Sequence, residues 1–143
     1  MTDINHDIIL KVTPLLKAHE GLRLKPYTCT VGKLTIGYGR NLDDMGINKA
    51  EAEHLLAQDI NRAIHDARSL IKGFDSLSLT RKAVLVDMMF NLGMNRLSQF
   101  KNMLCAIEEH NYNKASFEML NSLWAVQVGA RATVLAEMMT RGI

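Results

Sequence analysis

One glycine-rich, β-branched segment stands between stretches of helical periodicity and limits the folds open to this chain of 143 residues. Residues 24–39 are rich in Thr, Val, Ile, Tyr and Gly, which favours a small antiparallel hairpin. Apolar residues on both sides of this segment recur at helical spacing. The sequence therefore predicts an α+β fold in which one hairpin accompanies several helices.

The N-terminal helical stripe, over residues 6–19, ends near Glu20, and Gly21 is expected to stop the helix. Pro14 leaves two alternatives. Either Thr13 caps a helix with Pro14 in its first turn, or a longer helix kinks at Pro14. We favour the first alternative.

The longest predicted helix runs from about residue 49 to residue 71, after a loop at 40–47. Asn48 and Glu51 form a plausible capping pair at its start, and Gly73 follows its end.

Further helices are predicted in the second half of the chain. Ser78 can cap a helix from Leu79 to Leu92 that Gly93 ends. Shorter helices follow at about 100–109, 113–121 and 130–141. Methionines at helical spacing are usually core residues. This expectation covers positions 88, 89, 94, 103, 119, 138 and 139.

Composition excludes several classes of protein. An apolar fraction of 48% and a charged fraction of 22% are ordinary for a soluble globular domain. A formal net charge of +2, with no basic run, gives no support for nucleic-acid binding. Cys29 and Cys105 are far apart, which argues against a disulfide framework, and the scattered histidines form no metal-ligand pattern. No metal or cofactor is expected.

The N-terminus is acidic, and Lys11 interrupts the short apolar run behind it. We therefore expect no signal peptide and no membrane span, and synthesis in a reducing cytosol.

Glu20, Cys29 and Thr35 carry reactive side chains and lie close together in the sequence. Eight residues separate Glu20 from Cys29, and five separate Cys29 from Thr35. The sequence Glu-Gly-Leu-Arg-Leu begins at Glu20, and Thr-Ile-Gly-Tyr-Gly begins at Thr35. In spacing and in both flanking sequences this segment resembles the phage-type lysozymes, glycoside hydrolase family 24.

The resemblance implies a lysozyme-like architecture with a cleft suited to a polymer. A β-hairpin lobe would cover about residues 20–47 and a connecting helix about 49–71. A helical lobe would cover about 74–143 together with the N-terminal helix.

The resemblance also implies that Glu20 is the general acid. Hydrolysis of a glycosidic bond needs an acid for the leaving oxygen and a means of placing water at the anomeric carbon. A carboxyl that stays protonated near neutral pH is commonly partly buried, here in the cleft. Thr35 would position the attacking water.

Cys29 stands where many relatives carry Asp, and its role is open. It can act as a thiolate base, as a nucleophile, or as a polar wall of the water site, and a small buried apolar residue is the structural alternative.

Other residues are assigned by the resemblance as substrate contacts or supports. Asn41 would contact substrate, and Phe90 would either stack on a sugar face or pack in the core. Arg131 would lie against Glu20, with Asp87 sharing Arg131. Arg40 and Asp59 would form an ion pair between hairpin and helix.

The expected function is that of an endolysin muramidase, which hydrolyses the β-1,4 bond between N-acetylmuramic acid and N-acetylglucosamine in bacterial peptidoglycan. The enzyme would be a monomer in the host cytoplasm until a holin lesion releases it to the wall. A lytic transglycosylase and a non-catalytic wall-binding domain are the alternatives.

Overall fold

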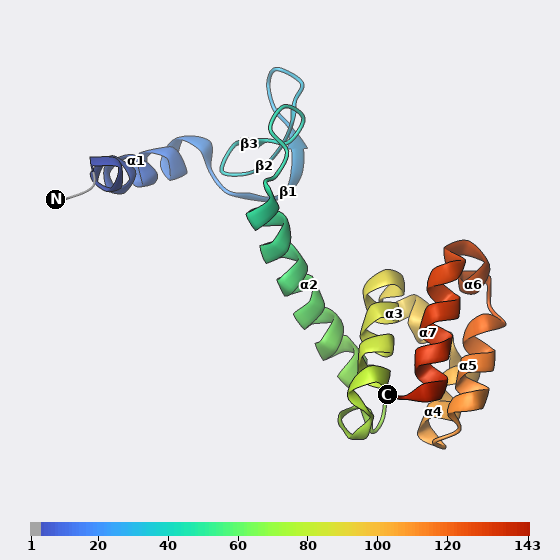
Figure 1. Cartoon of the computed structure of the whole chain (residues 1–143). Coiled ribbons are helices and arrows are strands. Elements are labelled where there is room, and N and C mark those ends of the chain that lie inside the picture. The colour runs from blue at the N-terminus through green and yellow to red at the C-terminus, as the bar shows by residue number, and fades with distance from the viewer. Residues whose placement is uncertain (1–3) are drawn as a thin grey trace. The chain divides into compact units, whose positions relative to one another are not determined.

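The structure is a computed structural model that describes residues 4–143. The chain forms two compact units, of which the first extends to Glu53 and the second runs from His54 to Ile143. The boundary between the units falls inside the long helix α2, Lys49–Leu70 (Figure 1). The bounds of this helix agree closely with the predicted 49–71. The predicted division into a β-hairpin lobe and a helical lobe that includes the N-terminal helix stays a prediction.

The N-terminal helix α1, Ile4–Glu20, passes through Pro14, so the favoured start at Thr13 is wrong and the longer helix is correct. Proline removes one backbone donor, which leaves the carbonyl one turn earlier without its usual partner. The Thr13 hydroxyl donates to the Ile9 carbonyl at 2.6 Å, a bond to the preceding turn of the kind that often accompanies a bend in a helix. Gly21 ends α1 as predicted, with φ +70° and its N–H donating to Lys17. No residue of α1 is buried.

The predicted hairpin is present and carries a third strand. Strand β1, Arg23–Thr28, pairs antiparallel with β2, Leu34–Gly37, and β2 pairs with the short β3, Arg40–Asn41. The register of β1 is interrupted before Tyr27. Proline cannot donate to a strand ladder, and Pro26 lies in this irregular part.

The second unit contains η1 (Phe74–Ser76), α3 (Leu79–Leu97), α4 (Lys101–Glu108), α5 (Tyr112–Leu120), α6 (Leu123–Val128) and α7 (Ala130–Arg141). In this unit α7 contacts α3, α5 and α6, and α5 contacts α4 (Figure 1). Within the described residues the buried apolar core lies in this unit.

Local signals placed most of these helices correctly. Ser78 caps α3 by accepting from the Arg81 N–H, and Gly93 breaks it with φ 80° and ψ 168°. Helices α4, α5 and α7 match the predicted ranges within two residues. The sequence analysis missed α6 and η1, which are too short for a periodic signal. The methionines expected in the core are buried or packed against it.

Arg81 fastens the end of α7 to α3. Its guanidinium donates to the carbonyls of Met139, at 2.8 Å, and Thr140, at 3.0 Å. It also lies 3.5 Å from the centroid of the Tyr112 ring. Cations near the last helical carbonyls complement the helix dipole, and stacking on an aromatic face adds to this.

We expect Arg81→Ala to lower the free energy of unfolding by about 2 kcal/mol, because two charge-assisted hydrogen bonds and the stacking are lost together. Urea unfolding followed by circular dichroism measures the change. Arg81→Lys keeps the charge without the planar fork and should recover only part of the loss. An Arg81→Ala variant with an unchanged unfolding midpoint contradicts this role.

No helix between residues 4 and 143 combines the length and apolarity that crossing a bilayer requires.

Candidate functional site

Thr35 occupies the central strand of the small sheet. It lies opposite Tyr27 of β1 and opposite Asn41 of β3. Directly opposed residues of antiparallel strands project to the same face of a sheet. The sheet therefore brings Thr35 and the predicted substrate contact Asn41 to one face.

Cys29 joins this face from the loop between β1 and β2. Its N–H donates to the Lys33 carbonyl at 2.9 Å, and the Gly32 N–H donates to the Cys29 carbonyl at 2.9 Å. With Gly32 at φ +84°, this is a tight loop that ends in a left-handed residue. Cys29 lies two residues after Tyr27 and is thus a diagonal neighbour of Thr35.

The Lys33 carbonyl anchors both predicted residues. Besides the Cys29 N–H, it accepts the Thr35 hydroxyl at 2.9 Å. Thr35 is 4% exposed, the one buried polar residue among those described. Its hydroxyl also lies within hydrogen-bonding reach of the Cys29 sulfur. A hydroxyl has a single hydrogen, so Thr35 can give it either to the carbonyl or to the sulfur.

The loop lowers the pKa of the Cys29 thiol below its ordinary value. The main cause is a hydrogen bond from the Lys33 backbone N–H, followed by one from Val31. The Thr35 hydroxyl lowers the pKa by a smaller amount, and partial burial raises it. Each donor favours the ionised sulfur. A lowered pKa increases the fraction of the thiol that is ionised at a given pH.

Glu20, the last residue of α1, lies against the turn between β2 and β3. A Cβ built on Gly39 would come 2.6 Å from Oε2 of Glu20. One turn earlier in α1, the Lys17 ammonium lies 5.4 Å from the centroid of the Tyr38 ring. Glu20 is exposed, so the residues of the first unit alone do not provide the partial burial that was expected for the Glu20 carboxyl.

The loop after β3 contains contacts that the sequence analysis missed. The Asp43 carboxylate accepts the Leu34 N–H at 2.6 Å. Asp44 accepts from the Lys33 ammonium at 3.1 Å and from the Asn41 side-chain amide at 2.9 Å. The Asn41 amide is thus already engaged by its own loop. Consecutive aspartates after a strand are a common turn signal, which is how this loop could have been found.

Arg40 has a partner that the sequence analysis did not name, and its predicted ion pair with Asp59, which would join the two units, stays a prediction. Arg40 donates to the Glu51 carboxylate at 2.9 Å and to the Gly46 carbonyl at 3.0 Å, while Asp59 pairs with Arg62. Glu51 precedes Asp59 by eight residues on α2, about 12 Å along the helix.

The pKa of Glu51 is lowered, mainly by the hydrogen bond from Arg40. The second cause is the hydrogen bond from the Asn48 N–H, which belongs to the predicted capping pair. The stabilisation from this ionised carboxylate is complete above its ordinary pKa and is lost as the pH falls through the lowered value.

In the second unit, Arg131 donates twice to Oδ1 of Asp87, at 2.9 and 2.7 Å, as expected. Both line a largely apolar pocket of about 370 Å³ together with Phe90, a residue that is 47% exposed. A second hollow of about 330 Å³ adjoins Phe90 and is lined by Asp59 and other polar residues. The expected contact of Arg131 with Glu20 joins the two units and stays a prediction.

Asn91, next to Phe90, accepts the indole N–H of buried Trp124 at 2.7 Å. Its amide therefore supports the core beside Phe90.

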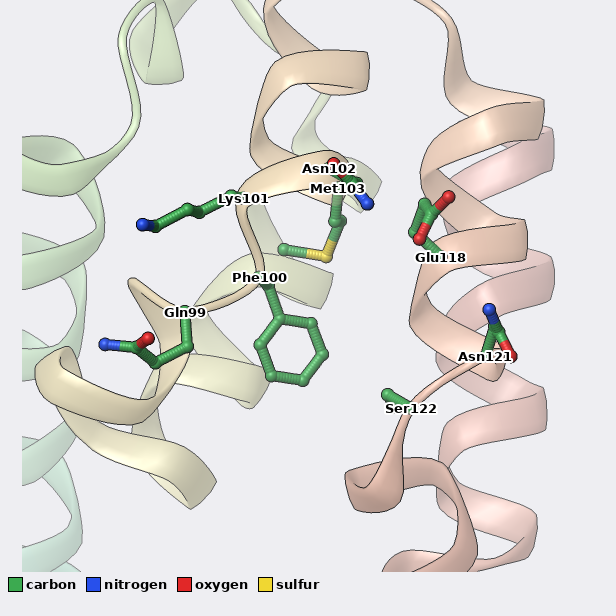
Figure 2. A pocket seen from close by; sticks show the side chains of 8 residues that line it. All are labelled: Gln99, Phe100, Lys101, Asn102, Met103, Glu118, Asn121 and Ser122. Atoms are coloured by element: carbon green, nitrogen blue, oxygen red, sulfur yellow. The ribbon is translucent and has the colours of Figure 1, made fainter.

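A larger pocket, of about 440 Å³, contains none of the predicted site residues (Figure 2). Figure 2 shows Phe100 and Met103 on one side and Glu118 and Asn121 on the other. Three side-chain amides, one lysine and one glutamate line it, without an arrangement of acid and nucleophile.

Over residues 4–143 no three His, Cys, Asp or Glu side chains gather in a way that could hold a metal ion.

Comparison with known proteins places these residues in a family. Residues 17–141 match the phage lysozyme family, a span that includes Glu20, Cys29 and Thr35. The chain is 30% identical to an endolysin of Acyrthosiphon pisum secondary endosymbiont phage 1, over 89% of this chain and 86% of that protein. It is 29% identical to a probable T4-type lysozyme of Dictyostelium discoideum, over 87% of this chain and 91% of that protein. A second such protein from that organism is 27% identical, over 94% of this chain and 96% of its own length. The resemblance in the hairpin segment is thus confirmed over nearly the whole chain, and the protein belongs to the phage lysozyme family.

Proposed function

We propose that this protein is an endolysin muramidase, with Glu20 as its general acid. It would hydrolyse the β-1,4 bond between N-acetylmuramic acid and N-acetylglucosamine in peptidoglycan. Membership of the phage lysozyme family points to peptidoglycan hydrolysis and to glycosidase activity. The observation that carries the finer assignment is the grouping of Cys29 and Thr35 on the Lys33 carbonyl, at the motif spacing from Glu20.

In the proposed reaction the Glu20 carboxyl gives its proton to the glycosidic oxygen as the bond from that oxygen to the anomeric carbon breaks. A water oxygen forms the new bond to the anomeric carbon, and the Cys29 thiolate takes the proton that the water releases. Proton release from the cysteine and return of a proton to Glu20, both through solvent, restore the starting state.

Thr35 would orient that water. When its hydrogen goes to the Lys33 carbonyl, which lies 2.9 Å from Oγ1, the lone pairs of Oγ1 are free to accept from a water molecule. The lowered pKa of Cys29 supports its role as the base, because a larger fraction of the thiol is ionised at a given pH.

Phe90 and the ion pair of Asp87 with Arg131 are proposed to bind sugar. An exposed aromatic ring beside a carboxylate offers one apolar face and one hydrogen-bond acceptor, which suits a pyranose ring. Asn41 would contribute mainly by holding the loop after β3, given its bonds to Asp44.

Release of a monomeric enzyme from the host cytoplasm through a holin lesion is part of this proposal and is supported only by the resemblance to endolysins.

Analysis of the products from purified peptidoglycan tests the function. After digestion and mass spectrometry, we expect muropeptides with a free reducing end at N-acetylmuramic acid, which borohydride converts to the alcohol. A 1,6-anhydro product would instead identify a lytic transglycosylase. Binding to the wall without any release of muropeptides would identify a non-catalytic domain.

A further inference from the structure

The Glu20 side chain lies directly over the backbone of Gly39, closer than any side chain at position 39 would allow. An added Cβ would sit 2.6 Å from Oε2, 2.9 Å from Cδ and 3.3 Å from Cγ of Glu20. Real Cβ atoms essentially never come within 3.0 Å of another heavy atom. The carboxyl therefore occupies space that only a glycine leaves open.

A second side chain near the end of α1 also lies against this turn. Besides the approach of Glu20 to Gly39, the Lys17 ammonium lies over the neighbouring Tyr38 ring at 5.4 Å from its centroid. Lys17 and Glu20 are three residues apart and thus project from neighbouring positions on the helix surface. The Ile36–Arg40 pair closes the turn and connects it to the strand that carries Thr35.

We propose that Gly39 is a positioning residue for the general acid. The bare backbone at Gly39 sets where the Glu20 carboxyl rests relative to the strand that carries Thr35. This inference rests on the proposed function, because it assigns Gly39 a role through Glu20.

Backbone conformation alone could also require glycine at this position, since φ is +78°. Gly37 separates the two explanations. It lies two residues earlier with φ +70°, but an added Cβ there would have nothing within 4 Å. Alanine at either position incurs a similar backbone strain, and only alanine at position 39 meets the Glu20 carboxyl.

The test compares Gly39→Ala with Gly37→Ala. We expect similar losses of thermal stability in both variants. In peptidoglycan hydrolysis, kcat should fall about 10- to 100-fold further for Gly39→Ala than for Gly37→Ala, with KM little changed, because a small misplacement of a catalytic group costs rate. In a Glu20→Gln background, Gly39→Ala should cause no further loss.

A second measurement does not depend on activity. The side-chain carboxyl 13C resonance of Glu20 should shift in Gly39→Ala and stay in place in Gly37→Ala. Equal kcat values and an unmoved Glu20 resonance would overturn the inference. A wild-type protein that releases no muropeptides would refute the proposed function, and the resonance would still decide whether Gly39 positions Glu20.

Discussion

Glu20→Gln is expected to abolish the clearing of peptidoglycan suspensions, with a rate loss of about 10²- to 10⁴-fold. Glutamine keeps the size and hydrogen-bonding capacity of the side chain but has no proton to give to the leaving sugar oxygen. The approach to Gly39 places this carboxyl at a defined point beside the sheet, so the substitution removes the acid without altering its surroundings. The fall in turbidity over time measures the effect.

A peptidoglycan-binding assay and a second glutamate variant serve as controls for indirect effects of Glu20→Gln. Co-sedimentation of Glu20→Gln with insoluble peptidoglycan should equal that of the wild type, because the acid is not expected to supply the binding energy. Glu53→Gln changes another exposed glutamate of the first unit, whose side chain is 67% exposed, and should clear at the wild-type rate. Undiminished clearing by Glu20→Gln would remove Glu20 from the mechanism.

Cys29→Ala is expected to lose most of the activity, about 10²-fold or more, because it removes the group proposed to take the proton from water. Cys29→Asp should retain substantial activity, since a carboxylate can perform the same task. Cys29→Ser keeps a small polar group that does not ionise in this range and should resemble alanine. Initial rates of muropeptide release measure all three. Full activity in Cys29→Ala would make Cys29 a structural residue.

The pH dependence of the same variants reports on the ionisation of Cys29. The backbone N–H of Lys33, then that of Val31, holds the pKa of the thiol below its ordinary value. Activity that needs the thiolate rises as the pH rises through that pKa. Cys29→Asp should move this rise to lower pH, because a carboxyl ionises near about 3.9. An identical rise in both enzymes would show that Cys29 is not the titrating base.

Elements with local signals could be predicted from the sequence. The hairpin followed from its β-branched residues and glycines, and the Ser78 and Asn48–Glu51 caps are present as expected. Cys29 and Thr35 both fall in the predicted hairpin, and the structure shows that the tight loop between its strands makes them diagonal neighbours. Such features depend on residues a few positions apart, where backbone geometry leaves few alternatives.

Contacts between distant segments were less predictable. Arg40 bonds Glu51, a partner that the sequence analysis did not name, and α1 continues through Pro14. Several carboxylates on one helix are equivalent partners until the direction of the neighbouring strand is known. Likewise, a proline removes one backbone donor but does not always end a helix, so the residues around Pro14 left two alternatives open.

The sequence by itself determined the family, the order of the longer helices and the hairpin, and the three residues proposed to carry the chemistry, because motif spacing and periodicity are properties of the chain. Only the tertiary structure decided that the Glu20 carboxyl rests on Gly39 and that one carbonyl, that of Lys33, anchors both Cys29 and Thr35. These contacts depend on the direction in which each side chain leaves its own element, which is fixed only when the end of α1 meets the folded sheet.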